Sequence, residues 1–293
     1  MNNSSKIGLV TVLYNSVEVL EGFFQSLSKQ TFKNFILYVI DNSPNDDALN
    51  EAKRLATIYN VPSEFVNNNA NLGVAKGNNQ GIELSLKNNC DYVLLLNNDI
   101  EFSENTIYDM LKYAEEKNES IIVPKIYYYG TNKLWMAGGH ISKWKGTSPH
   151  RGDTEEDIGQ YDEIEYTNYA PTCFMLIHKD IFKTVGIMDE KYFVYYDDTD
   201  FIWRANTLEY KIAYFPKSIV NHKVSFSTGG GESSFSIYYG TRNRIYFIRK
   251  NFCLFYKLIS LSFLHISRIV KYYKYNNEQR ENMVLGIKDG WKI

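Results

Sequence analysis

The sequence predicts an α/β fold with a mainly parallel central sheet, flanked by helices and followed by a helical C-terminal extension. Two observations lead to this fold class. Over the first hundred residues, short β-rich apolar segments alternate with segments of helical periodicity, which is the pattern of right-handed βαβ units. Polar residues follow three of the apolar segments directly, at the strand ends where parallel sheets bind ligands.

Four short apolar segments are predicted as strands, because each is bounded by polar residues and is too short for a typical helix. They are residues 7–14, 35–41, 64–68 and 92–97. Residues 17–29 and 46–59 place apolar side chains at helical spacing and are predicted as the connecting helices. Further along, residues 173–183 and 192–208 return to strand and helix patterns.

The segment 127–170 has weak periodicity and is rich in Tyr, Gly, Trp, Lys and acidic residues. It is predicted to form long loops with short strands. Long irregular loops in a compact domain are usually functional or disordered. The aromatic residues Trp135 and Trp144 favour the functional interpretation.

The C-terminal part has a different character, so we divide the chain into an α/β domain (1–240) and an extension (241–293). Residues 233–277 contain eight Lys or Arg and no Asp or Glu. Within them, residues 252–266 are almost wholly apolar, although a membrane span needs about 20 such residues. This composition favours a basic amphipathic helix on a membrane surface. A helix packed on the α/β domain or on another subunit remains an alternative.

Bulk properties exclude several other classes. The formal net charge of −2 over 293 residues gives no basic excess for nucleic-acid binding. The three cysteines lie far apart without metal-ligand spacing, and Cys90 and Cys173 stand beside apolar strand-like residues. They are predicted to be reduced, buried thiols. The N-terminus lacks the apolar core of a signal peptide. A cytoplasmic location is therefore expected.

Polar clusters at three strand ends are expected to converge on one crevice. They are Tyr14-Asn15, Asp41-Asn42-Ser43 and Asn97-Asn98-Asp99. Asn and Asp also favour turns, so a simple strand-to-turn boundary is the alternative for each cluster.

The helix predicted within residues 71–86 has Gly77 and Gly81 in its first turns. Because glycine weakens a helix, these positions indicate close approach of a ligand or of another backbone. With Lys76, the helix start would suit an anion. Close packing of the helix on the sheet is the alternative explanation for these glycines.

Three carboxylates lie within four positions at Asp197, Asp198 and Asp200. Like charges at this spacing repel, which raises the proton affinity of at least one of them and suits a general base. A helix N-cap ahead of residues 201–205 is the alternative, and both roles can coexist.

His222 ends another apolar run. Alone it would be structural, but beside Asp99 it would fit an oxygen-rich Mg²⁺ or Mn²⁺ site.

Nine segments follow one another in a characteristic order along residues 6–251. They are VTVLYN, DNSPND, NLGVAKGNNQGI, LLLNNDI, AGG, FMLIHKDIF, VGIMDEKYFVYYDDTDFIWRA, FPKSIVNH and RNRIYFIRKN. This order resembles that of family 2 glycosyltransferases, most of all the bacterial branch that includes rhamnosyltransferases. The resemblance implies a GT-A fold, a nucleotide-diphosphate sugar donor, a divalent metal and inversion at the anomeric carbon.

The resemblance also implies roles for individual residues. Asp99 takes the metal position of the family's DxD motif, and His222 matches a histidine that contacts metal or diphosphate. Asp198 matches the catalytic base, and Asp197 would orient it. Lys76 or a basic residue of 241–244 would support the departing diphosphate. The implied donor-binding residues are Tyr14, Asn15, Asp41, Asn42, Asn71, Gly73, Lys76, Asn79, Asn97 and Asn98.

The first expectation for the reaction is transfer of rhamnose from dTDP-rhamnose to a hydroxyl of a growing, lipid-linked cell-surface glycan at the inner face of the membrane. Transfer of a hexose or N-acetylhexosamine from a uridine diphosphate sugar is the alternative, as is a non-catalytic, membrane-associated protein that binds nucleotide or glycan. A sugar nucleotidyltransferase would need a basic Gly-rich loop near the start, and residues 10–23 contain no Lys or Arg. Self-association through the extension remains open.

Overall fold

The computed structural model describes residues 5–224 and 232–293. The first four residues of the N-terminal segment and residues 225–231 lie outside this range. The strands are β1 (Ile7–Leu13), β2 (Phe35–Asp41), β3 (Ser63–Asn67), β4 (Tyr92–Leu96), β5 (Ile100–Phe102), β6 (Ile121–Tyr128), β7 (Leu134–Met136), β8 (Glu165–Thr167), β9 (Phe174–His178) and β10 (Ile212–His222). The helices are α1 (Leu20–Ser28), α2 (Asp47–Ile58), α3 (Val74–Lys87), α4 (Thr106–Lys117), α5 (Lys179–Thr184), α6 (Asp197–Thr207), α7 (Ser234–Asn251), α8 (Leu254–Tyr272) and α9 (Asn277–Gly290), with short 3-10 turns at Val17–Val19 and Glu190–Tyr192.

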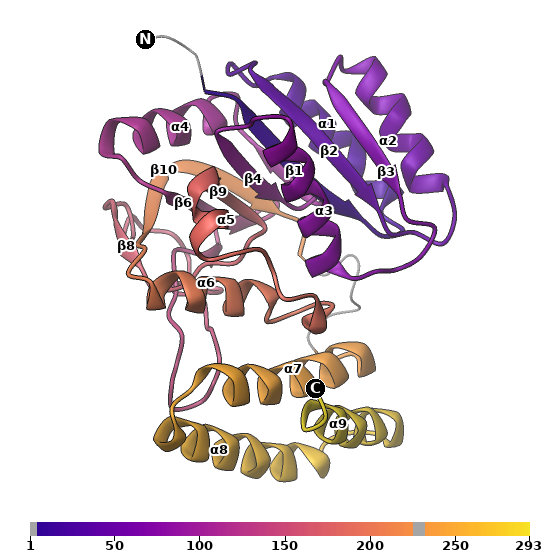
Figure 1. Cartoon of the computed structure of the whole chain (residues 1–293), viewed down its shortest axis with the longest axis vertical. Coiled ribbons are helices and arrows are strands. Elements are labelled where there is room, and N and C mark those ends of the chain that lie inside the picture. Colours follow the sequence, from indigo (N-terminus) through magenta and orange to yellow (C-terminus); the bar gives the residue numbers. More distant parts are fainter. Residues whose placement is uncertain (1–4, 225–231) are drawn as a thin grey trace.

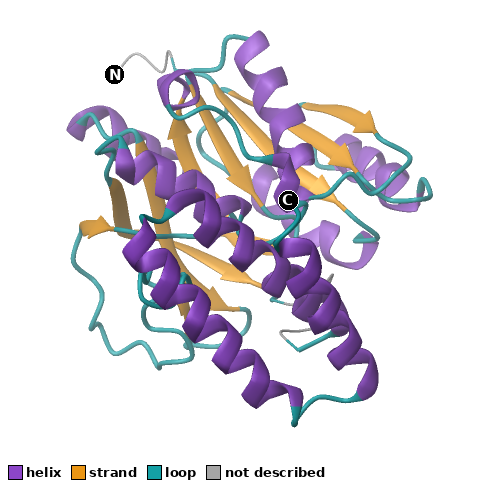
Figure 2. Ribbon diagram, turned by 60° about the horizontal axis from the view of Figure 1, so that its bottom comes forward, coloured by secondary structure: helices purple, strands orange, loops and turns teal. Residues whose placement is uncertain are grey.

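One sheet in the order β3-β2-β1-β4-β9-β6-β10-β5 forms the centre of the molecule (Figure 1). The predicted parallel arrangement is confirmed for β3, β2, β1 and β4, and β6 also runs parallel to β10. Antiparallel β9 lies between β4 and β6 and joins these two parallel groups. Figure 2 shows the strands side by side with helices on both faces of the sheet.

The glycines of α3 serve close packing of this helix on the sheet. A methyl group added at Gly77 would lie 2.7 Å from a side-chain carbon of Val12, and one at Gly81 would lie 2.2 Å from Val10. Both valines belong to β1. The packing alternative from the sequence is therefore the correct explanation for these two glycines.

The segment 127–170 is largely irregular as predicted, and it contains the end of β6 and the short strands β7 and β8. Cys90 and Cys173 are free and buried, as expected, whereas Cys253 is exposed. No helix in the described ranges is both long and apolar enough to cross a membrane.

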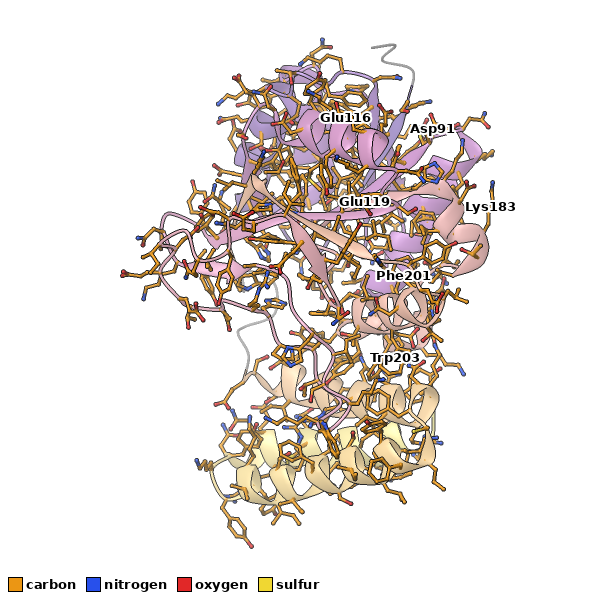
Figure 3. The ribbon with its side chains drawn as sticks, turned by 90° about the vertical axis from the view of Figure 1, so that its left-hand side faces the viewer. Asp91, Glu116, Glu119, Lys183, Phe201 and Trp203 are labelled. Atoms are coloured by element: carbon orange, nitrogen blue, oxygen red, sulfur yellow. The ribbon has the colours of Figure 1, made fainter. Side chains whose placement is uncertain are left out.

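The C-terminal helices α7, α8 and α9 form a layer below α6 (Figure 1). A second apolar core joins this layer to the rest of the chain, and α6 contributes to both cores. Figure 3 shows Phe201 on the side of α6 that faces the sheet and Trp203 on the side that faces the C-terminal helices. The expected boundary at residue 240 falls inside α7.

Candidate active site

A cavity of about 880 Å³ opens beyond the carboxyl ends of β1 and β4. Its walls come from segments that are distant in the sequence, including the loop before α6, the end of β10 and the start of α7. Eleven of the residues singled out in the sequence line it: Tyr14, Asn42, Asn71, Gly73, Asn97, Asn98, Asp99, Trp135, Asp197, Asp198 and His222. The expected convergence of the strand-end clusters on one crevice is thus observed.

One end of the cavity is built from the ends of β1 and β2. The side-chain amide of Asn42 donates to the carbonyl of Gly73 at 2.9 Å, and Asn98 donates to the hydroxyl of Ser16 at 2.7 Å. Asp41 lies just behind this wall and is fully buried. One of its carboxylate oxygens accepts from the backbone of Ser43, and the other has no partner among the described residues. Asp41, expected to bind the donor, therefore does not line the cavity itself.

Asn15, Lys76 and Asn79 do not line the cavity. The amide of Asn79 instead exchanges hydrogen bonds with the backbone of Met188, at 2.9 Å in both directions. The backbone N–H of Val74, at the start of α3, donates to the carbonyl of Phe193 at 2.6 Å. The first N–H groups of α3 are therefore occupied, and the expected anion site at this helix start is not formed.

Asp99 and His222 meet at the centre of the cavity. The Nε2 atom of His222 lies 3.1 Å from a carboxylate oxygen of Asp99 and 3.4 Å from the amide nitrogen of Asn97. Antiparallel pairing of β5 with β10 holds the two residues together, since His222 is in register with Ile100. Both side chains are more than nine-tenths buried.

These two side chains offer donor atoms of the kinds that a divalent cation accepts. No group of three or more His, Cys, Asp or Glu that could hold a metal occurs in the described ranges. Asp99 and His222 supply one carboxylate and one imidazole, and the Nδ1 atom of His222 is buried without a partner. Mg²⁺ is typically bound through one or two carboxylates plus substrate phosphates and water, so the remaining ligands would come from the donor.

The loop before α6 has an unusual backbone. Phe193, Tyr195 and Tyr196 have φ angles of 66°, 61° and 67°, in the left-handed region that large side chains rarely adopt. The buried side-chain amide of Asn243 on α7 holds this loop by donating to three of its carbonyls, those of Tyr192, Val194 and Tyr195, at 2.7–3.0 Å. Such backbone strain persists only where surrounding contacts enforce it.

This loop delivers Asp197 and Asp198 to the cavity at the start of α6. Both oxygens of Asp198 accept hydrogen bonds, one from the hydroxyl of Tyr169 at 2.8 Å and the other from Thr199. Burial raises the pKa of both carboxyl groups, and it raises that of Asp197, beside the charge of Asp198, to about 8. The hydrogen bonds from Tyr169 and Thr199 oppose the rise in the pKa of Asp198. A pKa of about 8 favours a proton on Asp197 at neutral pH, and the hydrogen bonds to Asp198 favour the ionised form of that carboxyl group.

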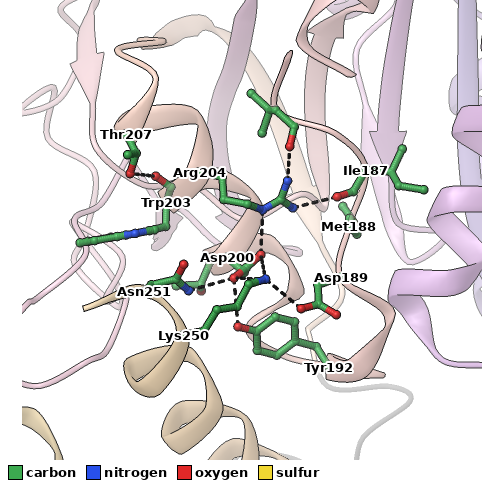
Figure 4. Close-up of polar contacts among 12 residues, drawn as sticks. Ile187, Met188, Asp189, Tyr192, Asp200, Trp203, Arg204, Thr207, Lys250 and Asn251 are labelled. Atoms are coloured by element: carbon green, nitrogen blue, oxygen red, sulfur yellow. Dashed lines mark hydrogen bonds and ion pairs between the residues drawn. The ribbon is translucent and has the colours of Figure 1, made fainter. Parts of the chain in front are cut away.

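Asp200, the third acid of the cluster, does not line the cavity. Its carboxylate is completely buried and accepts hydrogen bonds from Arg204, Lys250, Asn251 and Tyr192 at 2.9–3.1 Å (Figure 4). It therefore ties α6, which carries the acidic pair, to the end of α7.

An aromatic wall connects the two halves of the cavity. Trp135 makes edge contacts with the rings of both His150 and His222, at 4.5 Å between centroids, and His150 stacks on Tyr169 at 5.9 Å. Trp144 does not take part. It contacts Phe255 and Tyr256 around the start of α8, so of the two tryptophans only Trp135 lines the cavity.

The basic residues of 241–244 also lie outside the cavity lining. The guanidinium of Arg242 donates to the carbonyls of Lys191 and Tyr192, and that of Arg244 donates to the carbonyl of Lys145. The structure therefore does not place a residue of this segment where it would support the departing diphosphate.

Sequence reasoning missed Tyr169, His150 and Asn243. The first two come from the irregular segment 127–170 and its end, where no periodicity or motif marks a position. The sequence around Asn243 indicates only a basic segment, and nothing in it marks the asparagine. Its three carbonyl partners are about fifty residues away in the chain.

The sequence profile of glycosyl transferase family 2 matches residues 9–186. The chain belongs to glycosyl transferase family 2. It is 25% identical over 242 residues to a low-salt glycan biosynthesis hexosyltransferase, Agl10, of Haloferax volcanii, covering 81% of this chain and 74% of the relative. It is 24% identical over 312 residues to the dTDP-rhamnosyl transferase RfbF of Shigella flexneri, covering 98% and 96%.

Solved structures support the same fold. GalNAc-T7 with UDP, GalNAc and Mn²⁺ superimposes with a TM-score of 0.69 at 14% identity over all of this chain and 57% of that protein. TarS of S. aureus superimposes with a TM-score of 0.62 at 17% identity over 98% of this chain, which spans about half (49%) of the TarS chain. The expected GT-A fold and the expected glycosyltransferase activity are confirmed at the level of the family.

Proposed function

We propose that the cavity transfers a sugar from a nucleotide-diphosphate donor to an acceptor hydroxyl with inversion at the anomeric carbon. The observation that carries this proposal is the meeting of Asp99 and His222 with Asp197 and Asp198 around one cavity. The first pair suits a diphosphate and the second suits a base. A protein that only bound nucleotide would have no need for the second pair.

The donor lies with its nucleoside against the ends of β1 and β2, near Tyr14, Asn42 and Asn71. Its diphosphate lies beside Asp99 and His222. Asp99 and His222 would hold a divalent cation, which would supply positive charge to the leaving group.

Asp198 removes the proton from the acceptor hydroxyl while that oxygen forms a bond to the anomeric carbon. The bond between the anomeric carbon and the diphosphate oxygen breaks at the same time, and its electron pair leaves with the nucleoside diphosphate. Tyr169 and Thr199 hold the carboxylate of Asp198 in place. Asp197, protonated at neutral pH, adds no second negative charge beside the base.

We assign dTDP-rhamnose as the first donor to test, since the relative from Shigella flexneri is a dTDP-rhamnosyl transferase that matches nearly the whole chain. Uridine diphosphate hexoses and N-acetylhexosamines are the alternatives. A thermal-shift screen of these donors with and without Mn²⁺, followed by donor hydrolysis, tests the proposal. Metal-dependent stabilisation by one donor and its slow hydrolysis are expected. Absence of both with every donor would contradict the proposed function.

We also propose that α8 rests on a membrane surface, where a lipid-linked acceptor would be presented. One face of this helix packs on α7, and the other exposes large apolar side chains: Leu254, Phe255, Leu258, Phe263, Ile266, Ile269, Val270 and Tyr272. Trp144 lies against the same helix with 56% of its surface exposed, and Trp is favoured at membrane interfaces.

The contribution of basic residues to this surface is smaller than the sequence predicted. Arg242, Arg244 and Arg249 donate to backbone carbonyls, and Lys250 pairs with Asp189 and Asp200. Four of the eight basic side chains of residues 233–277 are thus bound to carbonyls or carboxylates of the protein itself. Apolar burial therefore dominates the expected membrane affinity, with a weaker dependence on salt.

The double variant Ile266→Glu/Ile269→Glu is expected to lose nearly all binding to vesicles that contain anionic lipid, because two charges would enter the apolar contact. Sedimentation of the full chain with vesicles measures this. Ile158→Glu is the matched control, since Ile158 is 85% exposed on a distant loop. Equal binding by the double variant would contradict the membrane contact, and a protein-concentration-dependent dimer lost in the same variant would assign the face to self-association instead.

A further inference from the structure

His150 lies on the wall of the cavity between the two pairs of residues that carry the proposed function. The ring of Trp135 contacts those of His222 and His150, both at 4.5 Å between centroids. His150 in turn stacks on Tyr169 at 5.9 Å, and the hydroxyl of Tyr169 donates to Asp198 at 2.8 Å. All five residues line the cavity. Trp135 and His150 therefore form the stretch of wall that connects the diphosphate end to the base.

Under the proposed mechanism, the transferred sugar lies beside this stretch of wall. In an inverting transfer, the attacking oxygen and the leaving oxygen are on opposite faces of the sugar ring at the anomeric carbon. The attacking oxygen lies next to Asp198, and the leaving oxygen belongs to the diphosphate at Asp99 and His222. The sugar ring thus occupies the space between them, where Trp135 and His150 form the wall.

The hydrogen bonding of His150 leaves one acceptor atom free. Its Nδ1 atom lies 3.1 Å from the backbone carbonyl oxygen of Trp135, and a carbonyl only accepts, so Nδ1 carries a proton. Burial lowers the pKa of His150, which favours the neutral imidazole. In that form Nε2 is an acceptor. It has no hydrogen-bond partner among the described residues, and a sugar hydroxyl is the kind of donor that it needs.

The charges around the cavity favour a neutral sugar. None of the Lys or Arg residues in the described ranges lines the cavity, whereas Asp99, Asp197 and Asp198 do. A carboxylate on the transferred sugar would lie near Asp198 without a basic side chain to pair with, and like charges in a partly desolvated site repel. A neutral sugar has only hydroxyls to satisfy, which suits an uncharged acceptor such as His150.

We propose that His150 is a specificity-determining residue for the transferred sugar, that its Nε2 atom accepts a hydrogen bond from a sugar hydroxyl, and that the site takes neutral sugars rather than uronic acids. This inference rests on the proposed function, because it assumes the places given above to the diphosphate and to the attacking hydroxyl. The carbonyl of Trp135 fixes the ring of His150 in the form that accepts. A site built to pair with a hydroxyl discriminates against a ligand that leaves its polar atom unpaired.

Calorimetric titration of the full chain in the presence of Mn²⁺ tests this assignment. Three ligands are compared for thymidine and again for uridine: the nucleoside diphosphate, its glucose conjugate and its glucuronic acid conjugate, with dTDP-rhamnose added to the thymidine series. The neutral conjugates are expected to bind at least about tenfold more tightly than the glucuronic acid conjugate of the same nucleoside, because the latter brings a carboxylate towards Asp198.

The variant His150→Phe keeps an aromatic ring but removes the Nε2 atom. It is expected to bind the neutral conjugates about three- to tenfold more weakly, the effect of one neutral hydrogen bond, and to bind the nucleoside diphosphates as the wild type does. His150→Gln retains a side-chain oxygen that can accept, so its loss should be smaller. His140→Phe is the matched control, because His140 is exposed and lines a neighbouring cavity instead. It should bind every ligand as the wild type does.

The loss of binding has to be confined to the sugar. A His150→Phe variant that melts like the wild type and binds the neutral conjugates equally well would overturn the assignment. So would an equal loss of nucleoside diphosphate binding, which would place the effect at His222. If His150→Phe does not fold, His150→Gln is compared with the wild type in the same way. Equal binding of the glucose and glucuronic acid conjugates would overturn the preference for neutral sugars.

Donor hydrolysis by the wild-type protein, measured in parallel, separates this inference from the proposed function. If a neutral conjugate is hydrolysed and His150→Phe binds it as the wild type does, the role of His150 is wrong and the proposed function stands. If the wild-type protein neither binds nor hydrolyses any conjugate, the proposed function itself is contradicted.

Discussion

Replacing Asp198 with Asn is expected to lower the turnover number for sugar transfer by a factor between about 10² and about 10⁴, the range that a general base contributes. The amide cannot accept the acceptor's proton, yet it keeps the shape of the carboxylate and one oxygen that can accept from Thr199 or from Tyr169. Donor binding should persist, because the nucleoside and diphosphate contacts lie elsewhere in the cavity. Transfer and donor binding are measured on the same preparation.

The pH profile provides the control for this variant. Asp198 acts as a base only when ionised, so the rate should rise with pH through the apparent pKa of the acidic pair. Burial raises the pKa of Asp198 and the hydrogen bond from Tyr169 opposes it. Tyr169→Phe should therefore shift the acid limb to higher pH, whereas Asp198→Asn should abolish the limb. Transfer by Asp198→Asn at the wild-type rate would contradict the assignment of the base.

Replacing Asp200 with Ala is expected to lower the free energy of unfolding by about 3–5 kcal/mol, the effect of removing one partner from a buried ion pair. Arg204 and Lys250 would each lose the carboxylate that they share, as would the amide of Asn251 (Figure 4). Since this carboxylate joins α6 to α7, the layer of C-terminal helices would also lose a main attachment.

Urea unfolding measures this effect, and Asp180→Ala is the matched control. Asp180 also pairs with a lysine on its own helix, Lys183, but both side chains are more than half exposed. Exposed pairs of this kind contribute at most about 1 kcal/mol. An Asp200→Ala variant as stable as Asp180→Ala would show that the buried network does not hold the two parts of the chain together.

The parts of the fold that sequence reasoning predicted are those that depend on local patterns. Strands β1 to β4 and their connecting helices follow from short apolar runs and helical spacing, and the polar residues after β1, β2 and β4 follow from the chain direction in a parallel sheet. The acidic pair and Asp99 were identified in the same way, because each directly follows or begins an element of clear periodicity.

The remaining features depend on contacts between distant segments. The sequence could not separate the packing of Gly81 on Val10 from a ligand site, because both need a residue without a side chain. It could not reveal that Asn243 holds the strained loop before α6 or that Tyr169 reaches Asp198. Nor could it reveal that Arg242, Arg244 and Arg249 donate to backbone carbonyls. The C-terminal helices therefore expose less positive charge on their surface than the sequence predicted.

The location of a bound donor tests the central claim most directly. Crystals grown with a nucleoside diphosphate and Mn²⁺ would locate the metal by its anomalous scattering. We expect one metal peak beside Asp99 and the diphosphate. The nucleoside is expected beside Tyr14 and Asn42, and the terminal phosphate is expected to face Asp198. A nucleotide bound outside this cavity, or a metal coordinated by residues other than Asp99 and His222, would contradict the account.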